Sequence, residues 1–256
     1  MTHRVGAPRR MALRCAAVFG AFAWLVPAAA QTVVVLSSNG VRAPVEDLTM
    51  QCIRAAGRPV SITYGTSSSI RQRITGGEVV DAVLATTDVV AELAKGGQLD
   101  SKSTPLGRAG IGVGVRVGAP HPKIGSAAEM KQALLSARSV TYAADGASRP
   151  HIERMFEQLG IAAEMKGKIL LEQGSTRAAE KVVAGDAEIL LTLVSEILPV
   201  NGLELLGPLP AEFQSYTSFA GAVGAHAQSR DAARAFIDCV AAPAAAATFT
   251  AKGLER

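Results

Sequence analysis

The stretch Tyr64-Gly65-Thr66-Ser67-Ser68-Ser69-Ile70-Arg71-Gln72-Arg73-Ile74 decides the fold that this chain is expected to adopt. The run Val60–Tyr64 is typical of a strand, and the spacing of Ile70 and Ile74 after Gly65 indicates a helix. A helix N-terminus carries unpaired backbone N–H groups and partial positive charge, which suit an oxyanion. A serine there can equally be a simple helix cap. Alone, the stretch predicts a strand, a glycine turn and a hydroxyl-rich helix start.

The residues on either side repeat this strand-then-helix order. Thr32–Leu36 and Asp81–Ala85 read as short strands buried on both faces, as in a parallel sheet. Helical patterns follow each of them and end at Gly57 and at Gly96. The first hundred residues therefore predict an alternating β-α arrangement in a parallel, doubly wound sheet.

Three successive strands of this region end in small polar residues. These clusters are Ser37-Ser38-Asn39, Thr66-Ser67-Ser68-Ser69 and Thr86-Thr87. Ligands bind beyond the carboxyl ends of strands in open parallel sheets, so the clusters are expected to line one cleft. They supply neutral hydrogen-bond donors, which suit an oxyanion removed from water.

The second half of the chain repeats this order, in which a strand is followed by polar residues at the start of a helix. Strand patterns at Ser139–Ala143, Ile169–Glu172 and Glu188–Val194 precede Ser148, Ser175-Thr176 and Ser195. Gly110–Val117 and Ser218–Val223 are predicted to cross between two lobes. We expect residues 31–110 plus 217–256 to form lobe 1 and residues 111–216 to form lobe 2.

The N-terminal 30 residues have a different composition. Four arginines precede or enter an apolar run, Met11–Val26, and Pro27-Ala28-Ala29-Ala30 follows it. This order is typical of a secretory signal peptide, here residues 1–30, which places the mature protein in the periplasm. An uncleaved anchor is an alternative, and Arg9-Arg10 leaves Sec and twin-arginine export both open.

Removal of that segment balances the charge of the chain. The full chain has 26 basic and 22 acidic residues, and the four arginines of the signal peptide account for the whole excess. The composition therefore gives no case for nucleic-acid binding. Cys52 and Cys239 remain, either as a disulfide or as two buried thiols.

The order of these pieces resembles the periplasmic molybdate- or tungstate-binding proteins of ABC importers. The strongest segments are Gly65–Ile74, Val80–Val83 and Gly96–Leu99, with further likeness at Ser148–Gly160 and at Ser175–Arg177. The resemblance implies a type II periplasmic binding protein fold, that is, two doubly wound Rossmann-like lobes joined by two crossover strands. It also implies a monomer without a cofactor that captures a small anion and delivers it to importer membrane subunits.

The resemblance also implies particular ligand-binding residues. In that family serine hydroxyls, backbone N–H groups and a tyrosine hold the anion, and these positions fall at or near Ser38, Asn39, Ser67, Ser68, Ser148, Thr176 and Leu193. Leucine cannot donate to an anion, so the tyrosine's hydrogen bond is missing here. Arg149, Arg71 or Arg177 could compensate, or could lie on solvated helix faces.

Enzymatic motifs are few in this sequence. His121, His151 and His226 lack metal-ligand spacing, and a serine nucleophile would need a base for which Asp81 is poorly placed. We therefore expect a binding protein for a molybdate-like oxyanion rather than an enzyme. The alternatives are a small organic carboxylate as ligand, or a secreted hydrolase that uses the cleft serines.

Overall fold

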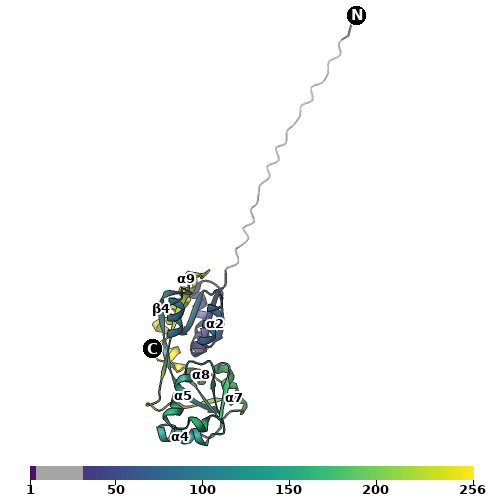
Figure 1. Ribbon diagram of the computed structural model, residues 1–256. Helices are drawn as coiled ribbons and strands as arrows, with labels where there is room; N and C mark the ends of the chain where they lie inside the picture. Colours follow the sequence, from purple (N-terminus) through teal and green to yellow (C-terminus); the bar gives the residue numbers. More distant parts are fainter. Residues whose placement is uncertain (4–30) are drawn as a thin grey trace.

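A computed structural model describes residues 1–3 and 31–256, so the predicted signal peptide lies almost wholly outside the described residues. Figure 1 shows two α/β lobes, one above the other, with β4 and the chain leading to the C-terminus running alongside their junction. The two-lobed α/β architecture predicted from the alternating pattern is confirmed.

Lobe 1 is built on a parallel ladder. β1 (Val33–Ser38) lies between β2 (Val60–Gly65) and β3 (Ala82–Thr86), and both pairings are parallel. The helices of this lobe are η1 (Asn39–Val41), α1 (Arg42–Ala56), α2 (Ser67–Thr75), α3 (Thr87–Lys95), α9 (Arg230–Ala241), η2 (Pro243–Ala245) and α10 (Ala246–Ala251). Each of these parallel strands runs directly into a helix at the edge that faces lobe 2.

Lobe 2 repeats the pattern. β5 (Val140–Ala143) lies between β6 (Ile169–Glu172) and β7 (Ile189–Leu193), again in parallel register. Its helices are α4 (Ala127–Ser136), α5 (Arg149–Gln158), α6 (Ala162–Met165), α7 (Ser175–Ala184) and α8 (Val194–Ile197). The last strand of this lobe, β8 (Leu203–Pro208), is antiparallel to β4.

Two long strands connect the lobes. β4 (Leu99–Arg116) pairs with β9 (Tyr216–Gly224) in lobe 1 and with β7 in lobe 2, all antiparallel. β4 begins much earlier than the predicted Gly110. The sequence did not predict this earlier part, because the side chains of Asp100–Thr104 are polar and largely exposed and give no apolar strand signal. The proposed lobe boundaries fall inside β4 and at the start of β9.

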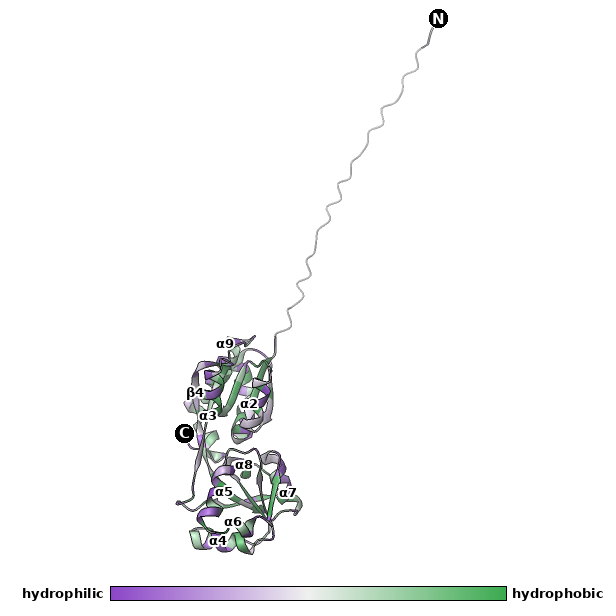
Figure 2. Cartoon of the chain, in the orientation of Figure 1, coloured by the Kyte–Doolittle hydropathy of each residue, from purple (hydrophilic) through white to green (hydrophobic). Residues whose placement is uncertain are grey.

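The strands inside both lobes consist largely of hydrophobic residues (Figure 2), and buried apolar side chains of strands and helices pack together as the core. One core runs through both lobes, and smaller clusters lie under α2 and α3 and under α7 and α8. Asp81, just before β3, accepts from the backbone of Val34 at 2.8 Å and of Ser229 at 2.8 Å, so this buried acid has the structural role expected of it.

A disulfide bond joins Cys52 of α1 to Cys239 of α9, with Cα atoms 5.5 Å apart. The structure thereby decides between the two alternatives that the sequence left open. The bond ties α9 to α1 within lobe 1, across 187 residues of sequence.

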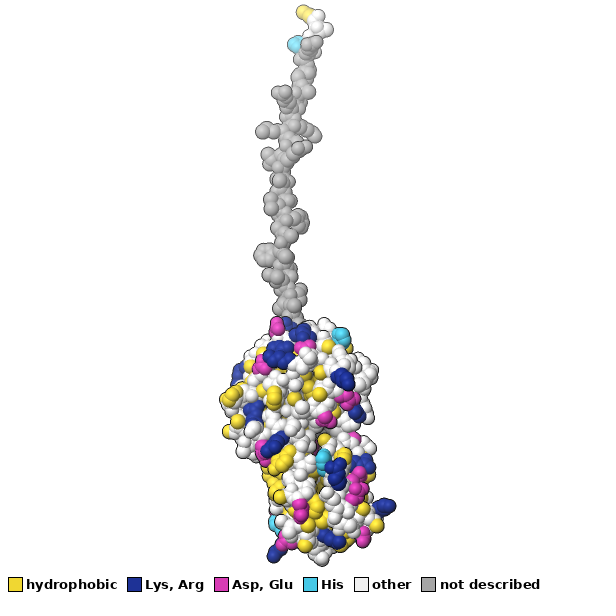
Figure 3. Space-filling view, turned by 60° about the vertical axis from the view of Figure 1, so that its left-hand side comes forward, with side chains coloured by type: hydrophobic (Ala, Val, Ile, Leu, Met, Phe, Trp, Pro, Cys, Tyr) yellow, Lys and Arg dark blue, Asp and Glu magenta, His cyan; other side chains and the backbone are white. Residues whose placement is uncertain are grey.

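Basic and acidic side chains are mixed over the face drawn in Figure 3. Among the described helices, none is by itself long and apolar enough to cross a membrane. α9 together with Pro243–Ala251 passes that test only as a pair bent by 50°. The apolar residues of this pair, such as Phe236, Ile237 and Phe249, are buried in the core.

Candidate functional site

A small cavity lies where the strand ends of the two lobes meet. Its volume is about 20 Å³, which is room for roughly one water molecule. Its walls come from both lobes and consist of Ser38, Thr66, Ser67, Thr86, Ala143, Gly146, Ala147, Ser148, Ser175, Thr192, Leu193, Glu196 and Phe219. We call this cavity the cleft. Its size means that the structure is a closed form.

The start of α2, with Thr66 and Ser67, supplies one wall of the cleft. Gly65 is the last residue of β2 rather than a turn, and a Cβ there would lie 2.6 Å from the Ser69 hydroxyl. Thr66 caps α2 by accepting from the Ser69 backbone at 3.1 Å. The Ser67 hydroxyl accepts from the Thr86 backbone at 3.0 Å, so its own hydrogen is free to point into the cleft.

The end of β1 contributes a second serine. The Ser38 side chain caps η1 by accepting from the Gly40 backbone at 3.4 Å. Phe219 packs so closely against Gly40 that a side chain at that position would collide with its ring. This packing fixes the turn. Because the Ser38 hydroxyl is the acceptor in the capping bond, its own hydrogen remains available for donation.

Lobe 2 places Ser148 and Leu193 opposite these serines. Ser148 is the residue before α5, and its hydroxyl has no hydrogen-bond partner among the described residues. The hydroxyl is therefore free to bond to a ligand in the cleft. Leu193 ends β7 and is buried in the cleft wall. The side chain near which the resemblance placed a tyrosine is thus apolar and part of the cavity wall.

The remaining predicted residues lie elsewhere. Asn39 and Thr176 line a neighbouring cavity, while Ser68 and Arg149 line neither this cavity nor the cleft. The Arg149 guanidinium binds Glu153 at 2.8 Å and the Ala144 carbonyl oxygen at 2.8 Å, which occupies it within lobe 2. Arg149 is therefore not placed to replace the missing tyrosine in this closed form.

The site residue that the sequence reasoning missed is Glu196, in α8. Its carboxyl lines the cleft and accepts from the hydroxyls of Ser175, at 2.8 Å, and Thr192. Burial raises the pKa of the Glu196 carboxyl, and nearby Asp145 adds to the rise, while hydrogen bonds from Thr192, Ser175 and the Leu193 backbone oppose it. The only sequence signal was its place directly after a strand that ends at the cleft.

Among the described residues, three side-chain hydrogen bonds cross between the lobes. Thr66 donates to Asp145 at 2.6 Å, the Asn39 amide donates to Ser175 at 3.3 Å, and Ser195 donates to the Gly40 carbonyl oxygen at 2.8 Å. These contacts hold polar side chains of one lobe against those of the other. They account for the small volume of the cleft.

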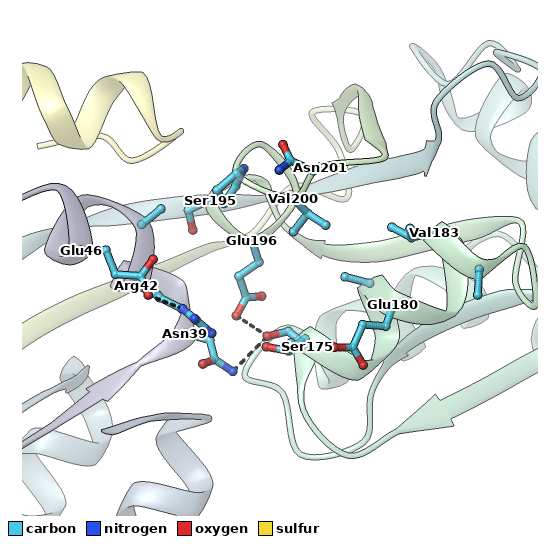
Figure 4. A pocket seen from close by; sticks show the side chains of 15 residues that line it. Asn39, Arg42, Glu46, Ser175, Glu180, Val183, Ser195, Glu196, Val200 and Asn201 are labelled. Carbon is cyan, nitrogen blue, oxygen red and sulfur yellow. Dashed lines mark hydrogen bonds and ion pairs between the residues drawn. The ribbon is translucent and has the colours of Figure 1, made fainter. Parts of the chain in front are cut away.

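A larger cavity, of about 470 Å³, adjoins the cleft and shares Ser175 and Glu196 with it. We call it the side chamber. Figure 4 shows Asn39, Arg42 and Glu46 on its lobe 1 side and residues of α7 and α8 opposite them. Arg42 binds Glu46 at 2.8 Å. Ala179, Val183 and Val200 add apolar surface to the chamber.

Within residues 1–3 and 31–256, no group of three or more His, Cys, Asp or Glu side chains is arranged to hold a metal ion. Nor is any lysine or arginine among the residues described as lining the cleft. The chemistry available there is hydrogen bonding by hydroxyls, by backbone N–H groups at helix starts and by one carboxyl group.

Two α/β lobes that close over a small polar cleft define a ligand-binding protein of the periplasmic type. The sequence matches the family described as bacterial extracellular solute-binding protein over residues 33–255, and the chain belongs to that family.

Solved structures of similar fold come from several binding proteins. The periplasmic molybdate-binding protein of Azotobacter vinelandii superposes with a TM-score of 0.72 at 15% identity, covering 88% of this chain and 99% of that one. The sulfate-binding protein of Mycobacterium tuberculosis gives a TM-score of 0.66 at 17% identity, covering 87% and 86%. At these identities the likeness establishes the type II fold.

A sequence relative has a different description. An aconitate isomerase of a Pseudomonas species is 29% identical over 231 residues, which cover 88% of this chain and 87% of the relative. The two chains therefore match over most of their lengths.

Proposed function

We propose that this protein captures a small oxyanion-bearing solute in the cleft, in the periplasm, and presents it to the membrane subunits of an ABC importer. The observation that carries the proposal is the convergence of hydroxyl groups from both lobes. Ser38 and Ser67 of lobe 1 and Ser148 of lobe 2 line the same closed cavity, with hydroxyl hydrogens that no described residue accepts.

A helix N-terminus strengthens this arrangement. α2 begins at the cleft, and the backbone N–H groups of Ser67 and Ser68 in its first turn have no acceptor among the described residues. α5 also begins at the cleft, next to Ser148, but its first turn has no unpaired N–H group, since Pro150 lacks one and those of Arg149 and His151 bond to the carbonyl oxygens of Gly146 and Ser148. Such a site stabilises a negatively charged oxygen by hydrogen bonds rather than by an ion pair. Lobe closure would bury the oxyanion, and the importer would recognise the closed form.

Calorimetry of the mature chain, residues 31–256, tests this proposal. Molybdate, tungstate, sulfate and a panel of organic acids are titrated separately into the protein. We expect saturable binding of at least one oxyanion at a stoichiometry of one. Binding only of uncharged solutes, such as sugars, would overturn the proposal.

A second candidate function is the isomerisation of an unsaturated organic acid. The observation that favours it is the carboxyl group of Glu196 in the cleft wall, a group able to accept and return a proton, in a chain with 29% identity to an aconitate isomerase. Proton NMR of the protein with cis- or trans-aconitate tests it. Interconversion that is lost in Glu196→Gln would support catalysis, whereas binding without interconversion would leave a solute-binding protein alone.

A further inference from the structure

Glu196 is an unexpected residue in a site that is suited to an anion. Its side chain lies between the cleft and the side chamber, and Figure 4 shows its carboxyl directed at Ser175. The two hydroxyls bonded to it, of Ser175 and Thr192, occupy lone pairs on both of its oxygens. An ionised carboxylate here would repel any oxyanion bound beside it.

The charges around Glu196 do not relieve this repulsion. From lobe 2, Asp145 faces the same region and adds negative charge. Across the side chamber, Arg42 is already paired with Glu46, and Glu180 of α7 is a further acid. A neutral, protonated Glu196 would instead offer an O–H donor to the ligand.

We propose that Glu196 selects the ligand by binding one carboxylate of an organic acid through its own proton, with the rest of that acid in the side chamber. This inference rests on the proposed function, since it names the ligand class and the donor within the same cleft. The bond is an O–H···O⁻ hydrogen bond between the two carboxyl groups, and any proton that Glu196 lacks beforehand is taken up from solvent.

The same geometry disfavours a doubly charged oxyanion such as molybdate. No described lining residue of the cleft is a cation, so only neutral hydrogen-bond donors would hold a second negative charge there against the repulsion of Asp145. An organic acid places one charge in the cleft, and its remaining atoms have about 470 Å³ available in the side chamber.

Calorimetry between about pH 5 and about pH 8.5, in two buffers of different ionisation enthalpy, tests the proposal by counting the protons taken up on binding. The ligands are molybdate and the organic acid that binds most tightly. The proteins are wild type, Glu196→Gln, which keeps an uncharged donor of similar shape, and Glu157→Gln as the matched control. Glu157 is an exposed residue of α5.

For wild type and for Glu157→Gln, we expect affinity for the acid to fall by about tenfold per pH unit above the Glu196 pKa, with uptake of up to one proton. For Glu196→Gln, we expect an affinity for the acid that is nearly independent of pH, and no proton uptake at this position on binding. Organic-acid binding with the same pH profile in Glu196→Gln would overturn the inference and leave the proposed function standing. So would tighter binding of molybdate than of any acid. Failure of all anions to bind wild type would overturn both.

Discussion

The Ser67 hydroxyl has two tasks at once. It accepts from the buried Thr86 backbone at 3.0 Å, and it lines the cleft, where its hydrogen is free to be donated. Ser68, the next residue, is partly exposed and does not line the cleft. From the sequence, both serines were equivalent candidates, and the structure separates them because only Ser67 is buried in the cleft wall.

Ser67→Ala is therefore expected to weaken anion binding by about tenfold or more, which corresponds to about 1.5–3 kcal/mol for a hydrogen bond to a charged group. It should also lower the free energy of unfolding by about 1–3 kcal/mol, since a buried N–H loses its acceptor. Calorimetry and urea denaturation measure the two effects. Ser68→Ala is the control, with affinity expected within about twofold of wild type, and equal losses in both variants would contradict this placement of the site.

Glu196 also makes stability depend on pH. Because its pKa is raised from the ordinary value of 4.5, the folded chain holds the proton more strongly than the unfolded chain does. The stabilisation that Glu196 contributes is therefore complete at pH values below its pKa in the unfolded chain. It is lost as the pH rises through its higher pKa in the folded chain. Glu196→Gln removes this dependence.

We expect the melting temperature of Glu196→Gln, compared with wild type, to rise progressively as pH increases from about 4 to about 8 without ligand. Thermal denaturation followed by circular dichroism measures the difference. A constant difference across this range would mean that Glu196 does not titrate in it.

At the scale of elements, the disulfide bond changes how the C-terminal segment is held. α9 packs against α1 in lobe 1, although the two helices are far apart in the sequence, and Cys52–Cys239 links them covalently. A cross-link over so long a separation restricts the unfolded chain strongly. Both cysteines lie in lobe 1, and the loop that the bond closes contains the whole of lobe 2.

Cys52→Ala with Cys239→Ala is expected to lower the free energy of unfolding by about 2–5 kcal/mol. Urea denaturation of this double variant, compared with wild type in the presence and absence of a reductant, measures the loss. The reductant should affect wild type alone. Equal stability of oxidised wild type and the double variant would contradict a stabilising role for the bond.

Predictability from sequence also differs between elements. The parallel strands β1, β3 and β7 are nearly continuous apolar runs, and each of them was located closely from the sequence. β4 was not, because its first half, Leu99–Arg108, mixes polar residues with Pro105 and Gly107. Pairing with β9 holds that half in extended form, and such a long-range contact leaves no local pattern.

For the whole molecule, the contacts between lobes imply an equilibrium between open and closed forms. The closed cleft has about 20 Å³ of space, less than a molybdate or a carboxylate group needs, so the lobes must separate before a ligand enters. Among the described interlobe side-chain bonds, the one from Ser195 to the Gly40 carbonyl oxygen is buried and involves no residue that lines the cleft.

Ser195→Ala should therefore favour the open form without ligand, by about 1 kcal/mol or roughly a fivefold shift in the equilibrium. Small-angle X-ray scattering would detect this as a larger radius of gyration that decreases when the ligand is added. Ser69→Ala is the matched control, since its hydroxyl bonds only to the Thr66 carbonyl within lobe 1. An equal expansion in both variants would exclude the interlobe bond as the cause.

The sequence by itself determined the α/β class, the two-lobed repeat and the polar ends of the strands, because these follow from local periodicity and from residue preference at helix starts. Only the tertiary structure decided which polar residues meet. It paired Cys52 with Cys239, directed Ser67 into the cleft and Arg149 away from it, and brought Glu196 to Ser175. The physical reason is that most of these contacts join different helices and strands of one lobe, so they depend on how those elements pack and leave no local pattern in the sequence.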